Sequence, residues 1–114
     1  MSDTLRGTTV VKVGDRELTL KPTLGAVRKI EAVLGGLVPA FQALGKGSVD
    51  GVVCIVAAGA ELKAEQLDEL AEQVFQAGVQ DVAFQLIPYV SFLLKPSYKD
   101  EEPGEGNALP AAAL

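Results

Sequence analysis

The chain has 114 residues, with 10 basic and 15 acidic side chains, one cysteine and no histidine. Without histidine it has no imidazole general base, no Ser-His-Asp or Cys-His triad and no imidazole ligand for zinc. A single cysteine excludes an intramolecular disulfide and a cysteine-held metal cluster. At 48% hydrophobic and 22% charged residues, the composition is that of one ordinary globular domain stabilised by core packing.

The formal net charge of −5 is unevenly distributed. Residues 1–35 carry six basic and four acidic side chains, whereas residues 36–94 carry two and seven. Nucleic-acid binding depends on a basic surface that releases counterions from phosphate, so this balance argues against it. The N-terminus lacks the features of a secretory signal, and no apolar run approaches the roughly 20 residues that span a bilayer. We therefore expect a cytoplasmic protein with neither nucleic-acid nor membrane partners.

An N-terminal β-hairpin is predicted over residues 8–21, after a flexible segment at residues 1–7. Apolar and polar side chains alternate on both sides of Gly14-Asp15, and a period of two is typical of strands. Glycine supplies the positive φ that a tight hairpin turn needs. Pro22 biases the preceding residue toward extended backbone, and Thr23 can cap the helix that follows.

Helical periodicity predicts that helices form the rest of the domain. Glycines separate the first three helices, at Gly35-Gly36 and at Gly45-Lys46-Gly47, and Ser48 can cap the third. The third helix is apolar almost all round, which is typical of a central core helix, and Cys54 within it is predicted to be a small buried hydrophobe. The predicted helices cover about residues 24–34, 37–44, 48–60, 64–77 and 79–94.

The last predicted helix carries an apolar stripe that is too wide for one small core. Either the other elements bury all of it, or part of it is an interface. Pro88 removes a backbone hydrogen bond and should kink or divide this helix. If part of the stripe is an interface, the partner-binding residues are Phe84, Tyr89, Phe92 and Leu93.

After residue 95 the composition changes to proline, glycine, alanine and acidic residues without apolar periodicity. Such a segment cannot bury enough surface to offset its ordering entropy, so residues 96–114 are predicted to be a disordered tail. The expected fold class is mainly α with a small N-terminal β-hairpin (α+β), in a single domain over residues 8–95.

No part of the sequence predicts a catalytic, cofactor-binding or metal site. Gly45-Lys46-Gly47-Ser48 matches neither a P-loop nor a dinucleotide-binding fingerprint. The acidic residues of segment 64–77 lie on the polar side of an amphipathic helix, where a solvated face is expected rather than an acid-base pair with shifted pKa values. Those residues are Glu65, Asp68, Glu69 and Glu72. We therefore expect a protein that is not an enzyme and binds no cofactor or metal.

The passage from the hairpin into the first helix resembles a known family. Its most specific part is Leu20-Lys21-Pro22-Thr23, preceded by Leu5-Arg6-Gly7 and followed by Ile30-Glu31 and Leu34-Gly35. This pattern is similar to the small tail assembly chaperones of siphophages and prophages, in particular those of the gene-transfer-agent type. The similarity covers most of residues 5–94.

The resemblance implies a non-enzymatic protein of the bacterial cytoplasm that binds a tape-measure protein, helps to recruit tail-tube subunits during tail assembly, and then leaves. Two alternatives stay open: a structural tail protein that remains in the particle, and a small regulatory or interaction domain. A homo-oligomer is also compatible with the sequence, through the last helix or by strand addition at the hairpin edge.

Overall fold

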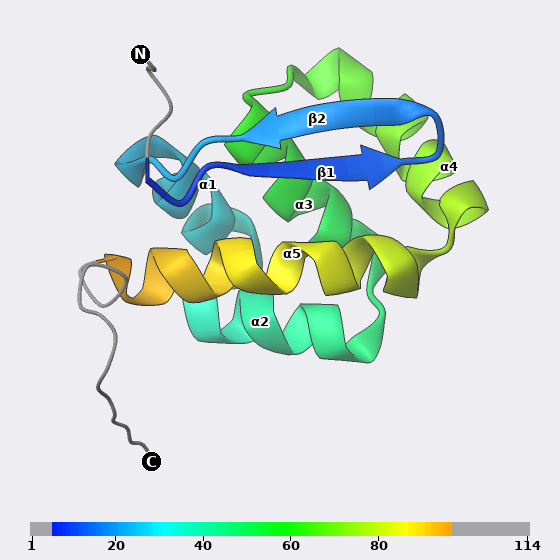
Figure 1. Ribbon diagram of the computed structural model, residues 1–114. Helices are drawn as coiled ribbons and strands as arrows, with labels where there is room; N and C mark the ends of the chain where they lie inside the picture. The colour runs from blue at the N-terminus through cyan, green and yellow to red at the C-terminus, as the bar shows by residue number, and fades with distance from the viewer. Residues whose placement is uncertain (1–5, 97–114) are drawn as a thin grey trace.

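The computed structural model describes residues 6–96, which form a two-stranded hairpin and five helices (Figure 1). The mainly α fold with an N-terminal hairpin is thus confirmed. A single 3-10 turn precedes the fourth helix, within the segment predicted as one helix. In chain order the elements are β1 Thr9–Val13, β2 Arg16–Leu20, α1 Leu24–Leu34, α2 Leu37–Lys46, α3 Val49–Ala60, the 3-10 turn η1 Ala64–Gln66, α4 Leu67–Ala77 and α5 Val79–Leu94.

The hairpin has one buried and one exposed face. β1 and β2 pair antiparallel from Thr9 opposite Leu20 to Val13 opposite Arg16, which leaves Gly14-Asp15 as a two-residue turn. Gly14 has a φ of 63°, the left-handed conformation that such a turn requires. Because side chains alternate along a strand, this register places all the buried strand residues on the face that packs on α3 and α5. They are Val11, Val13, Leu18 and Leu20.

A side chain of α5 closes the outer edge of β1. The Gln85 amide accepts a hydrogen bond from the Lys12 backbone N–H at 2.8 Å and donates one to the Lys12 carbonyl at 2.9 Å. It occupies the place that a neighbouring strand's peptide group would take. Strand addition at this edge, one of the predicted routes to an oligomer, would therefore have to displace Gln85.

The predicted helix caps are confirmed. Thr23 Oγ1 and Ser48 Oγ each accept a hydrogen bond at 3.0 Å from the backbone N–H three residues further on. α1 ends at Gly35 in the left-handed conformation, and α2 ends in the same way at Gly47. α2 continues through Gly45 to Lys46, two residues beyond the prediction, because it is Gly47 that leaves helical geometry.

α3 lies at the centre of the helical body, as predicted. Eight of its twelve residues are buried, and it contacts β2 and the four other helices. Two of its glycines permit close approach of neighbouring elements. A Cβ at Gly51 would lie 2.7 Å from the Cβ of Ala43, and one at Gly59 would lie 2.8 Å from the Cβ of Leu20.

α5 is a continuous helix over the range predicted, so of the two expected effects of Pro88, a kink or a division, the division does not occur. Pro88 lies on the exposed side of the helix. Its missing N–H leaves only the carbonyl of Phe84 without its usual partner. Phe84 also lies on the exposed side, where solvent can satisfy that carbonyl.

The chain before β1 differs in part from the prediction of a flexible segment at residues 1–7. Arg6 and Gly7 form a turn, and Thr9 Oγ1 donates a hydrogen bond to the Gly7 carbonyl at 3.1 Å. Residues 1–5 and the predicted tail beyond Pro96 lie outside the described residues.

Candidate functional site

The described side chains bear on the predictions for metal sites, acidic pairs and Cys54. Across residues 6–96, no group of three His, Cys, Asp or Glu residues could hold a metal ion, and apart from Tyr89 no residue with a polar or charged side chain is buried. The acidic side chains of segment 64–77 are exposed, as predicted. Cys54 is half-buried rather than fully buried, and burial raises the pKa of its thiol. Less of this cysteine is therefore the nucleophilic thiolate at neutral pH than of a free cysteine.

Three of the four predicted partner-binding residues are core residues, which corrects the sequence prediction. Tyr89, Phe92 and Leu93 are buried. The stripe on α5 can be this wide because α5 is covered from several directions, by β1, α2, α3 and α4. Of the four residues, Phe84 alone is on the surface, with 75% of its area exposed.

Tyr89 joins α5 to the end of the hairpin. Its hydroxyl donates a hydrogen bond to the Lys21 carbonyl at 2.6 Å. Burial, with a further contribution from the negative charge of Glu61, raises the pKa of Tyr89 to about 12. Phe92 packs against the backbone of Gly7, where an added Cβ would overlap its ring. These contacts are structural and leave neither side chain free to meet a partner.

Phe84 lines a groove between α2 and α5, two helices that lie side by side (Figure 1). We call this the α2–α5 groove. It has a volume of about 280 Å³. Phe41 and Ile87 line it with 38% and 37% of their areas exposed, and Val38 and Leu94 add exposed apolar area further along the two helices. Its lining consists of Phe41, Leu44, Gly45, Gln80, Ala83, Phe84 and Ile87.

Sequence reasoning missed Phe41 and Ile87. A signal was present, because in each helix an alanine directly precedes the phenylalanine. Ala40 and Ala83 are both buried. Small residues such as these let two helices pack closely. The phenylalanine that follows each alanine lies about 100° further round its helix, and therefore at the edge of the contact between α2 and α5.

A second groove lies on another face of the molecule, where α3 lies between α1 and α4 (Figure 1). We call it the α1–α3–α4 groove. Its volume is about 490 Å³. Small side chains of α3 form the floor, at Val53, Cys54, Ala57 and Ala58. Sequence reasoning missed this groove. α3 is apolar on all sides, so its sequence does not indicate which of its sides the neighbouring helices leave uncovered.

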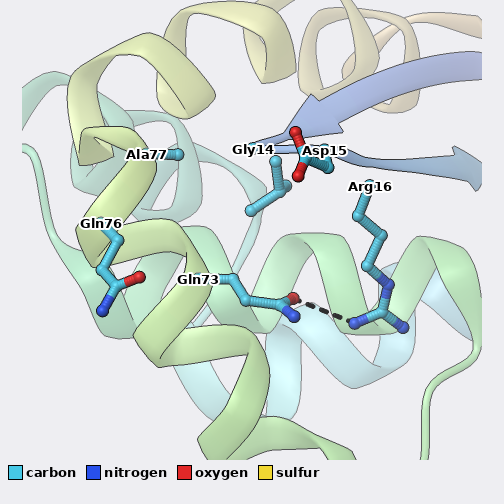
Figure 2. A pocket seen from close by; sticks show the side chains of 7 residues that line it. Gly14, Asp15, Arg16, Gln73, Gln76 and Ala77 are labelled. Carbon is cyan, nitrogen blue, oxygen red and sulfur yellow. Dashed lines mark hydrogen bonds between the residues drawn. The ribbon is translucent and has the colours of Figure 1, made fainter.

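A third pocket, of about 520 Å³ and with several polar side chains in its lining, lies between the hairpin turn and α4 (Figure 2). Arg16 Nη1 donates a hydrogen bond to Gln73 Oε1 at 3.0 Å, which ties the hairpin to α4. Asp15 and Gln76 also line this pocket. Asp15 supplies the one carboxylate in this lining.

No single helix in the described part of the chain is both long and apolar enough to cross a membrane. The segment Ala64–Ala77 and α5 reach that length and composition only as a pair, and they are bent by 109° with respect to each other. Comparison of the chain with protein-family models, with curated proteins and with solved structures gives no match.

Proposed function

We propose that this protein is a non-enzymatic tail assembly chaperone of a siphophage or prophage, of the gene-transfer-agent type. In this role it binds the tape-measure protein in the bacterial cytoplasm, helps to bring tail-tube subunits to it, and is released when the tail is complete. The proposal rests on the resemblance of the hairpin-to-helix passage, and on an exposed surface that suits an apolar partner.

The α2–α5 groove is the observation that carries this proposal. Two phenylalanines and an isoleucine meet there at the surface. Grooves of this kind receive the apolar face of an amphipathic helix, with aromatic side chains as anchors. A long helical tape-measure protein exposes many such faces before the tail tube covers them. A chaperone that lacks chemical groups but offers an aromatic groove fits that need.

Co-expression with the tape-measure protein of the same genome tests the proposal. The wild-type chain should keep the tape-measure protein soluble and co-purify with it. Phe84→Asp should abolish both effects, because a carboxylate at the groove cannot be desolvated against an apolar helix. Phe75→Asp is the matched control, since Phe75 lies on α4 outside the groove lining and is 69% exposed.

A tape-measure protein that is equally insoluble with and without the chain would contradict the proposal. Mass spectrometry of purified tails separates it from the alternative of a structural tail protein. A chaperone is absent from the finished particle, whereas a structural component is present in many copies.

A further inference from the structure

The α1–α3–α4 groove has the shape of a helix site. α1 and α4 each pack on α3 and form the two walls (Figure 1). The floor consists of alanine, valine and cysteine side chains, so an incoming helix can approach the α3 backbone closely. Val33 on α1, which is 68% exposed, and Leu67 on α4 extend the apolar lining up the walls.

The two walls carry opposite charge. Lys29 lines the groove from α1 and Asp68 lines it from α4, while Asp50 adds a second carboxylate from the first turn of α3. All three side chains are exposed, and none takes part in a salt bridge with another of the described residues. They are therefore available to pair with charges on an occupant.

We propose that this groove binds an amphipathic helix whose apolar stripe is flanked by basic residues on one side and acidic residues on the other. The basic flank lies against Asp68, and the acidic flank lies against Lys29. A helix can enter a groove in either direction, and this pairing favours one of them. The inference rests on the proposed function in one respect, which is that the helix belongs to the tape-measure protein.

Cys54 makes occupancy of the groove measurable. It is the chain's one cysteine and lines the groove, so alkylation by iodoacetamide reports on this site alone. The probes are two synthetic helical peptides of about five turns that share one leucine and alanine stripe. The first has lysine on one flank and glutamate on the other, and the second has glutamate on both flanks.

The first peptide should slow alkylation of Cys54 roughly tenfold at a concentration ten times its Kd, and the second should have a much smaller effect. Asp68→Lys should reverse this preference, because both walls then carry a positive charge. Glu72→Lys is the matched control, since Glu72 is exposed on α4 but does not line the groove. That variant should keep the wild-type preference.

Equal protection by the two peptides, or protection by neither, would overturn the inference. The tape-measure protein gives a separate result. If it is solubilised by the chain while Cys54 in the complex reacts as fast as in the free chain, the inference fails and the proposed function stands. If the first peptide protects Cys54 but the tape-measure protein is not bound, the proposed function fails and the groove retains its specificity for the peptide.

Discussion

The two faces of α5 carry similar residues but differ in how far the rest of the chain covers them. One face contains Tyr89, Phe92 and Leu93, which are buried beneath the hairpin, the N-terminal turn and the other helices. The opposite face contains Phe84 and Ile87, which line an open groove beside α2. Aromatic and aliphatic side chains occur on both, so hydrophobicity alone does not distinguish the buried face of this helix from the face at the groove. What distinguishes them is whether another element of the same chain covers that face.

The largest expected effect in this comparison comes from Phe92→Asp. A carboxylate would be buried against the Gly7 backbone without a partner, and the packing of the ring would be lost. We expect a loss of about 4 kcal/mol or more in the free energy of unfolding, enough to unfold a domain of this size. Far-UV circular dichroism and urea denaturation measure this. A native spectrum with an unchanged urea midpoint would place Phe92 on the surface.

Gly59→Ala tests how closely the core face of α5 packs on α3. The added methyl group would lie 2.8 Å from the Tyr89 hydroxyl oxygen and 2.8 Å from the Cβ of Leu20. We expect a loss of about 1–3 kcal/mol, measured by urea denaturation, because the backbone must shift. Gly25→Ala is the control, since its Cβ would meet only Thr23 Oγ1 at 3.7 Å. An equal effect at the two sites would show that helix propensity dominates over packing.

Tyr89 gives the core face a dependence on pH. The pKa of Tyr89 is raised from 10.0 to about 12, chiefly by burial and then by the charge of Glu61. Between these values the unfolded chain has already lost the phenolic proton while the folded chain keeps it, so stability falls as pH rises from 10 to 12. Thermal unfolding across this range should show a steeper fall for the wild-type chain than for Tyr89→Phe. Parallel curves would contradict the raised pKa.

Tyr89→Phe also has an effect at neutral pH. It leaves the Lys21 carbonyl without its hydrogen bond from Tyr89, which should cost about 1 kcal/mol in urea denaturation. A variant as stable as the wild-type chain would show that solvent replaces this hydrogen bond.

The smallest expected effect comes from the exposed face. Phe84→Ser removes a side chain that is 75% exposed, so the free energy of unfolding should change by no more than about 0.5 kcal/mol. The same variant should lose tape-measure binding in the co-expression experiment. A large loss of stability would mean that the α2–α5 groove is closed by its own side chains in solution and is part of the core.

The sequence by itself determined the order and approximate bounds of the elements and which way most side chains face. The alternation of apolar and polar residues set the register of the hairpin, and Gly14 set its turn. The limits of the first three helices were set by the capping residues Thr23 and Ser48 and by the glycines Gly35 and Gly47. These features depend on residues that are close in the chain, so their causes can be seen in the sequence. The acidic face of α4 follows from the same periodicity.

Only the tertiary structure decided which apolar residues are core and which line a groove. Tyr89 is buried because Gly59, which has no side chain, leaves room for its ring beside Lys21. Phe92 is buried because the backbone of Gly7 lies against its ring. Phe84 is exposed because no described element crosses the outer side of α2 and α5. The floor of the α1–α3–α4 groove is open because α1 and α4 leave that side of α3 uncovered. Such outcomes depend on contacts between residues far apart in the chain. Periodicity along one helix reports that a face is apolar but not what covers it.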